Sequence, residues 1–119
     1  MKPGDTFLGG GEVHGTHHLW VVVNDPAAHG GEAVIVNVST LRPGAETTCA
    51  LSKGEHPFIQ RDSYVRYQSA RKVSVKNLQA AVKNGLLKSR TAASAALLAK
   101  IQAGAQASPL LPLELRGLL

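Results

Sequence analysis

The chain has 119 residues, of which 44% are hydrophobic and 18% charged. This length and composition predict one globular domain with a modest core, and they exclude a disordered chain. The single cysteine, Cys49, excludes an intrachain disulfide and fits a reducing compartment. No apolar run approaches the length of a membrane span, and no signal-peptide core follows Met1. We therefore expect a cytoplasmic protein with no membrane partner.

The formal net charge of +5 is unevenly distributed along the chain. Residues 1–48 carry two basic and five acidic side chains, whereas residues 53–90 carry nine basic and two acidic ones. An asymmetry of this kind favours a polyanionic partner such as nucleic acid, although a solvated basic face explains it equally well. The candidate contacts are Lys53, Arg61, Arg66, Arg71 and Lys72.

The first two thirds of the chain read as short strands separated by glycine and proline turns. The segment 33–40 is the clearest strand because β-branched residues fill it and it becomes polar at its end. The apolar run after His18 indicates a buried strand, and it places Trp20 in the core. We expect strands over 5–8, 18–24, 33–40 and 47–51, and one bent strand or two over 63–67 and 70–73.

The last third of the chain changes to helical patterns. Ser74 is a good N-cap for a first helix, which Asn84-Gly85 would end. A second, alanine-rich helix is expected from an N-cap at Ser89 to Ala107, and a short final helix from Pro112. Strands followed by helices predict a mainly β fold of the α+β class: a small antiparallel barrel over 1–74 with a helical extension over 75–119, in a single domain 1–119.

Three histidines, His14, His17 and His18, lie within five residues and end directly against an apolar strand. Imidazole is the side chain whose ordinary pKa places its charge change near neutral pH. A titratable cluster at the mouth of a buried strand is therefore a candidate catalytic site, a candidate metal site, or a solvated loop.

The order of several short segments resembles the MazF/PemK/Kid toxin superfamily. The resemblance covers residues 3 to about 90 and rests on Pro3-Gly4-Asp5-Thr6-Phe7, on the segments 18–25, 34–40, 62–65 and 71–78, and on Asn84-Gly85-Leu86-Leu87. It implies an SH3-like barrel with C-terminal helices and an RNA-cleaving toxin of a toxin–antitoxin system. It also implies a homodimer and a cognate antitoxin protein as partner.

The resemblance further implies two functional positions. The catalytic arginine that the family carries before its second strand would fall on His18 or the neighbouring His17. The hydroxyl at the end of the third strand would fall on Ser39 or Thr40. Residues 3–41 contain no arginine, and Leu19 stands where the family has proline. If this chain cleaves RNA, a histidine must replace the arginine.

RNA can be cleaved without a metal or other cofactor when a base deprotonates the 2′-hydroxyl, a cation stabilises the phosphoryl oxygens and an acid protonates the leaving oxygen. His17 or His18 as base and His56 as acid would fill these roles, with Lys53 or Arg61 as the cation. We expect a metal-independent endoribonuclease.

Two alternatives remain open at the level of the sequence. The same barrel can be a non-catalytic module that binds nucleic acid or a protein through its basic face. It can also be a metal-dependent hydrolase, since zinc takes imidazole and thiolate ligands. The four candidate ligands would be His14, His17, Cys49 and His56, although their spacing matches no standard zinc module.

Overall fold

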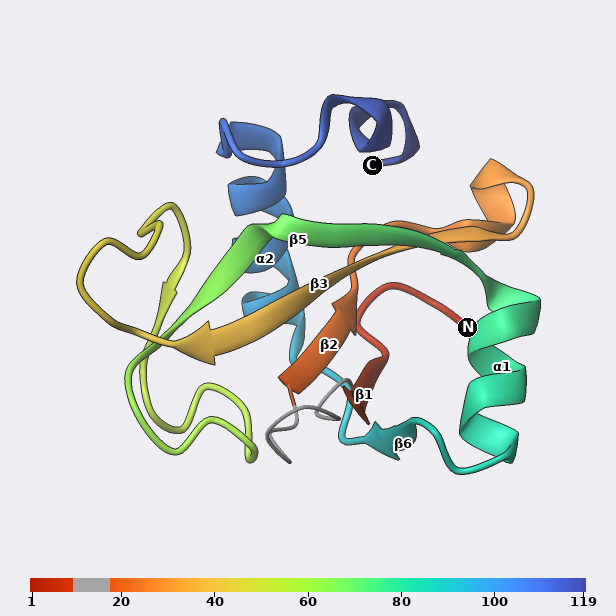
Figure 1. The fold of residues 1–119 in the computed structure, drawn as a ribbon, viewed down its shortest axis with the longest axis horizontal. Coiled ribbons are helices and arrows are strands. Elements are labelled where there is room, and N and C mark those ends of the chain that lie inside the picture. Colours follow the sequence, from red (N-terminus) through yellow and green to blue (C-terminus); the bar gives the residue numbers. More distant parts are fainter. Residues whose placement is uncertain (10–17) are drawn as a thin grey trace.

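The structure, a computed structural model, describes residues 1–9 and 18–119. Within these residues six strands form one antiparallel sheet in the order β4-β5-β3-β2-β1-β6. The sheet curls into a half-barrel, with α1 at one end and α2 behind it (Figure 1). The prediction of a mainly β fold with C-terminal helices is therefore confirmed. The strands are β1 (Thr6–Gly9), β2 (His18–Val22), β3 (Glu32–Thr40), β4 (Ala50–Leu51), β5 (Ser63–Ser74) and β6 (Lys88–Arg90).

The two long strands β3 and β5 pair with each other, and residues 33–39 of β3 are all buried. Their side chains alternate between two apolar clusters because successive residues of a strand point to opposite faces. Val34 and Val36 belong to the cluster that α2 covers, whereas Ala33 and Ile35 belong to the cluster that α1 covers. The register of the two strands shifts between Ile35 and Asn37, where the pairing is irregular.

The helices close the two faces of the sheet. Helix α1 (Val75–Lys83) begins at its predicted cap, Ser74, whose hydroxyl accepts the Asn77 amide hydrogen, and it buries Leu78. Helix α2 (Ala95–Ala107) buries Leu97 and Ile101 in the larger cluster. Short 3₁₀ helices, η1 (Pro26–His29) and η2 (Leu113–Leu118), complete the described elements.

The predicted start of the second helix is wrong. Ser89 lies in β6, the edge strand that pairs with β1, and the helix begins five residues later with Ser94 as its cap. Pairing with β6 gives hydrogen-bond partners to backbone N–H and C=O groups of β1 that would otherwise lack them. This tertiary contact outweighs the helical propensity of the alanines. Part of the segment 75–119 therefore belongs to the sheet rather than to a purely helical extension.

The leucine-rich tail packs on the body of the protein. Leu111 and Leu115 are buried in the α2 cluster, and the Arg116 guanidinium donates to the backbone oxygens of Gln106 and Ser108. Among the described residues, no helix combines the length and the apolar character needed to cross a membrane.

Candidate nucleic-acid interface

A pocket of about 430 Å³ lies where β3 ends and β2 begins, at the arrowhead end of β3 in Figure 1. The strand register explains why polar residues gather there. β2 pairs with β3 through Leu19 and Val38, and Thr40 at the end of β3 pairs with Ser63 at the start of β5. Three strand ends therefore meet at one edge. The lining consists of His18, Val38, Ser39, Thr40, Arg42, Phe58, Ile59, Gln60, Arg61 and Ser63.

This pocket brings together four of the residues that the sequence singled out. His18, Ser39, Thr40 and Arg61 come from β2, β3 and the segment before β5, and they are separated by up to 43 positions in the chain. His18 is half-buried and Ser39 is buried, whereas Thr40 and Arg61 are exposed. The pocket thus combines an imidazole, two hydroxyls and a guanidinium within one hollow.

His18 is oriented by the backbone of the neighbouring strand. Its Nδ1 lies 3.4 Å from the carbonyl oxygen of Val38, at the long end of the hydrogen-bonding range. A carbonyl oxygen only accepts, so this contact is a hydrogen bond when Nδ1 carries the hydrogen. In that tautomer Nε2 carries the lone pair, and it makes no hydrogen bond among the described residues.

Two arginines contribute positive charge to the pocket. The backbone of Arg61 is held by the Ser63 hydroxyl, which donates to the Arg61 carbonyl oxygen at 2.8 Å. Arg42 follows the end of β3, where the Leu41 amide donates to the Asp62 carbonyl oxygen. Among residues 1–9 and 18–119 the salt bridge is between Lys100 and Glu55, so neither pocket guanidinium is paired with a carboxylate there. Both are available to an anionic ligand.

His56 is not one of the residues that line this pocket, and its ring is bound by backbone groups. Its side chain is 3% exposed, its Nε2–H donates to the Thr91 carbonyl oxygen at 2.6 Å, and its Nδ1 accepts the Phe58 amide hydrogen at 3.0 Å. These two bonds use both ring nitrogens and require the neutral tautomer with the hydrogen on Nε2. His56 therefore holds the segment before β5 against the segment after β6.

The remaining candidate cations are distributed over a wider surface. Arg66 is exposed on β5 and lines a second hollow of about 240 Å³, which shares Arg42 with the first pocket. Arg71 lies over the Trp20 ring at 5.4 Å from its centroid, a cation–π contact, and Trp20 is in the core as predicted. Lys53 and Lys72 are exposed and line neither hollow.

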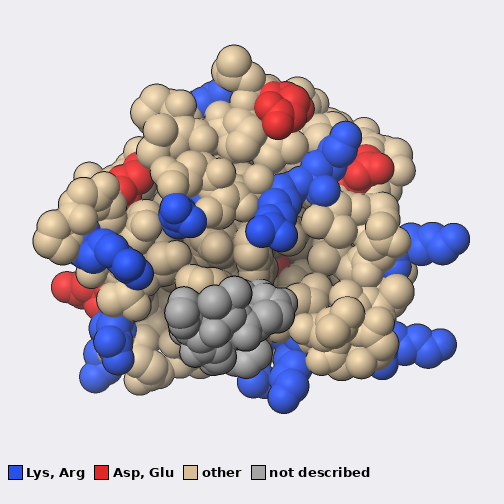
Figure 2. Space-filling model, in the orientation of Figure 1, with Lys and Arg blue, Asp and Glu red and all other residues tan. Residues whose placement is uncertain are grey.

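Lysine and arginine side chains spread over the face of the molecule drawn in Figure 2, and the acidic side chains visible there lie toward its upper and left rims. Arg42, Arg61 and Arg66 of the two hollows add exposed positive charge to the surface of the protein. A polyanion is attracted to such a surface by its phosphates, independently of base sequence.

Two of the four candidate metal ligands, Cys49 and His56, lie within the described residues. His14 and His17 lie outside the described residues. Cys49 is buried, and burial raises the pKa of its thiol above the ordinary value of 9.0. Among residues 1–9 and 18–119, no group of three or more His, Cys, Asp or Glu side chains is placed to hold a metal ion.

Arg42 and Phe58 are among the lining residues that sequence reasoning did not single out. Arg42-Pro43-Gly44 reads as a turn, although its position two residues after Thr40 places it beside the predicted hydroxyls. Phe58 carries no comparable signal, because nothing in the neighbouring sequence indicates whether this aromatic side chain is buried or exposed.

Comparison with known proteins adds no identification. No protein-family model matches the chain, and no curated protein matches its sequence.

Proposed function

We propose that this protein is a metal-independent endoribonuclease that binds single-stranded RNA at the pocket formed by His18, Ser39, Thr40, Arg42 and Arg61. The observation that supports it best is the convergence of His18, the two hydroxyls and Arg61 on one hollow at the strand ends. Two guanidinium groups that form no salt bridge among the described residues, beside one imidazole, suit an anionic phosphodiester and a proton transfer.

The proposed reaction begins at His18. The Nε2 of His18 accepts the proton of the 2′-hydroxyl, and the 2′-oxygen attacks the adjacent phosphorus. Arg61 and Arg42 stabilise the negative charge that develops on the phosphoryl oxygens, and the Thr40 hydroxyl donates to one of them. The bond from phosphorus to the 5′-oxygen breaks, and water protonates that leaving oxygen. The products are a 2′,3′-cyclic phosphate and a 5′-hydroxyl.

His56 has no part in this proposal. Both of its ring nitrogens are engaged by backbone groups, so it has no free position from which to donate a proton to a leaving group. A catalytic role for His17, which lies outside the described residues, stays a prediction.

The likeness to the MazF/PemK/Kid superfamily adds a biological setting to the proposal. An RNA-cleaving protein of this kind would arrest the growth of its host, act as a homodimer, and be neutralised by an antitoxin protein. Induced expression in a bacterium, with and without His18→Asn, tests this setting. Growth arrest by the parent chain and normal growth with the variant support it, whereas equal growth in both cultures contradicts it.

The reaction itself is tested with purified protein and a labelled single-stranded RNA in excess chelator. We expect cleavage by the parent chain and a loss of at least about 100-fold in rate for His18→Asn, the usual range for removal of a general base. Arg61→Ala should weaken binding, and Lys53→Ala is the matched control because Lys53 is exposed outside the pocket. Unchanged cleavage by His18→Asn would overturn the mechanism.

A non-catalytic RNA-binding module is the second candidate. The observation that favours it is that His18 is the only histidine among the described lining residues. Binding that weakens steeply with added salt, without any cleavage, would support this reading over the first.

A further inference from the structure

Phe58 is an aromatic side chain exposed at the rim of the pocket. Its exposed fraction is 38%, whereas its neighbours His56 and Ile59 are each 3% exposed. The ring lines the same hollow as His18 and Arg61. A single exposed apolar residue needs no explanation by itself. Phe58, however, lines a pocket with two arginines, where its ring can contact the apolar face of an anionic ligand.

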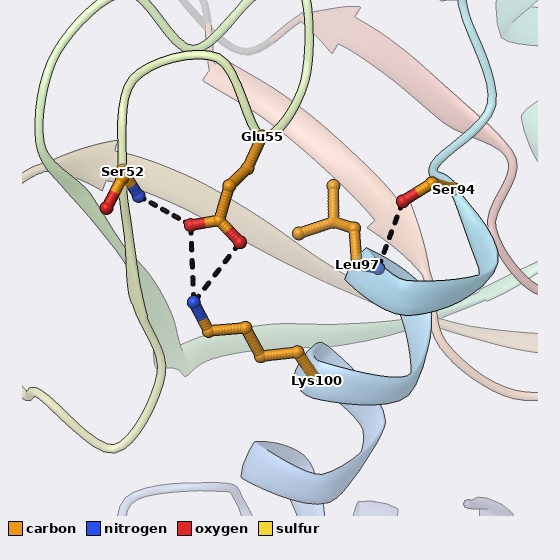
Figure 3. Close-up of polar contacts among 5 residues, drawn as sticks. All are labelled: Ser52, Glu55, Ser94, Leu97 and Lys100. Carbon is orange, nitrogen blue, oxygen red and sulfur yellow. Dashed lines mark hydrogen bonds and ion pairs between the residues drawn. The ribbon is translucent and has the colours of Figure 1, made fainter.

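The segment that carries Phe58 is anchored at several points. The Gly54 amide donates to the Ile59 carbonyl oxygen at 2.9 Å, and the Ile59 amide donates to the His56 carbonyl oxygen at 2.9 Å. The Glu55 carboxylate accepts the Ser52 amide hydrogen at 2.6 Å and pairs with Lys100 of α2 at 3.2 Å (Figure 3). The loop is thus tied to the helix behind the sheet.

Buried groups on both sides of Phe58 hold it outward. Ile59 belongs to the apolar cluster under α2, and the His56 ring connects the Phe58 amide to the Thr91 carbonyl oxygen. Because the chain is fixed at 56 and 59, little backbone freedom is left between them. A ligand that contacts the Phe58 ring would order it at low entropic cost.

We propose that Phe58 is a stacking platform for one nucleobase of the single-stranded RNA whose phosphate lies on Arg42 and Arg61, and that His56 is its positioning residue. This inference rests on the proposed function and deepens it. Aromatic side chains exposed beside cationic groups bind unpaired bases by stacking, and this contact tolerates any base because every base has a π-face. The pocket would therefore hold the base and the phosphate of one nucleotide together.

The test is a binding measurement that distinguishes contacts to the bases of the RNA from contacts to its sugar–phosphate backbone. The probes are a fluorescein-labelled octaadenylate with 2′-O-methyl riboses, which cannot be cleaved because the nucleophile is blocked, and an abasic octamer with the same backbone. Dissociation constants are measured by fluorescence anisotropy for the parent chain, Phe58→Leu, Phe58→Trp and Arg61→Ala. Phe58→Leu keeps an apolar side chain of similar size, and thermal unfolding checks that each variant folds.

We expect Phe58→Leu to weaken octaadenylate binding by about 5- to 100-fold, the range reported for removing one stacked base, and Phe58→Trp to retain it. Both variants should bind the abasic octamer as the parent does, and Arg61→Ala should weaken both probes. Octaadenylate should also quench the added Trp fluorescence of Phe58→Trp, relative to the parent chain with Trp20 alone.

The role of His56 has its own readout. His56→Gln should weaken octaadenylate while leaving the abasic octamer unchanged, as Phe58→Leu does. Equal weakening of both probes by His56→Gln would indicate general disruption and overturn its positioning role.

The other outcomes separate the two proposals. Octaadenylate binding that depends on Arg61 but not on Phe58 overturns the stacking proposal and leaves the proposed function intact. Equal weakening of both probes by Phe58→Leu also overturns it, because Phe58 would then act on the fold of the loop. If neither probe binds the parent chain, both proposals fail.

Discussion

The same strand, β5, contributes to two regions of opposite character. In its middle, Tyr67 is buried against Gly104 of α2, and its hydroxyl donates to the Ile101 carbonyl oxygen at 2.7 Å. At its start, Ser63 lines an open pocket with two exposed arginines. We call these regions the Tyr67–Gly104 contact and the strand-end pocket.

The two regions differ because helix α2 packs its apolar side chains on the middle of the strands and not on their ends. Helix α2 covers the middle of the strands, so every group there must be apolar or satisfied internally. At the strand ends this cover is missing, and polar side chains can face a ligand without a desolvation penalty. Stability should therefore depend on the first region and activity on the second, and substitutions in each should affect the other very little.

The largest stability effect is expected for Gly104→Ala. A Cβ at this position would overlap the Tyr67 hydroxyl, and it would lie 2.9 Å from Cζ of Tyr67 and 3.0 Å from Cβ of Cys49. Overpacking and a disturbed buried hydrogen bond should lower the free energy of unfolding by about 2 to 3 kcal/mol, after the gain in helix propensity is deducted. Urea denaturation measures this.

Gly117→Ala is the matched control, because a Cβ there would have no heavy atom within 4 Å. Its unfolding free energy should change by less than about 0.5 kcal/mol. Equal effects at positions 104 and 117 would contradict the close contact between β5 and α2.

In the strand-end pocket, Thr40→Val should affect activity and not stability. The substitution keeps the β-branched shape at an exposed strand end but removes the hydroxyl that the proposal places on a phosphoryl oxygen. We expect about a tenfold loss in cleavage rate, as for one hydrogen bond to a charged group. Thr47→Val, in the exposed segment before β4, is the control and should cleave RNA as the parent does. Indistinguishable rates for both variants would remove Thr40 from the site.

The comparison also shows which parts of the molecule the sequence can predict. The long strand 33–40 and the cap at Ser74 were predicted because β-branched burial and local capping chemistry are written into neighbouring residues. The start of α2 was predicted wrongly because Ser89 and Ser94 are equally good caps, and only pairing with β1 decides between them.

The candidate site was predictable to a similar extent. His18 was singled out by the histidine cluster before an apolar strand, and Ser39 and Thr40 by the resemblance to the toxin superfamily. Arg42 and Phe58 lie in loops whose paths depend on contacts elsewhere. The burial of His56 depends on Thr91, which is 35 residues away in the chain. No local pattern predicts such a contact.

Alkaline pH should weaken the Tyr67–Gly104 contact. Burial, followed by the adjacent Cys49, raises the pKa of Tyr67 well above its ordinary value of 10.0, and burial raises that of the Cys49 thiol above 9.0. The native state then holds protons that the unfolded chain releases, so the free energy of unfolding falls as pH rises above about 9. The slope is at most about 1.4 kcal/mol per pH unit for each group.

Urea denaturation between pH 8 and pH 11 measures this slope. Tyr67→Phe lacks one titrating group and should flatten the part of the slope above pH 10. A slope that is the same in Tyr67→Phe and the parent would show that Tyr67 does not contribute.

The smallest effect is expected at the loop that carries Phe58. Glu55→Gln removes the partly exposed salt bridge to Lys100 and should lower the unfolding free energy by less than about 1 kcal/mol. The Ser52 amide, followed by Lys100, lowers the pKa of Glu55 below 4.5, so the difference from the parent should shrink as pH falls below that value. Lys53→Gln, in the same loop, is the control. If the unfolding free energies of Glu55→Gln and the parent chain differ by the same amount at low pH, a role for the ionised carboxylate is contradicted.

The identity of the RNA ends produced by the purified protein tests the central claim most directly. A single-stranded RNA is incubated with the protein in excess chelator, and the fragment masses are determined. Attack by the 2′-oxygen predicts fragments that end in a 2′,3′-cyclic phosphate and begin with a 5′-hydroxyl, and His18→Asn should yield neither. Fragments with a 3′-hydroxyl and a 5′-phosphate, or intact RNA with the parent chain, would contradict the account.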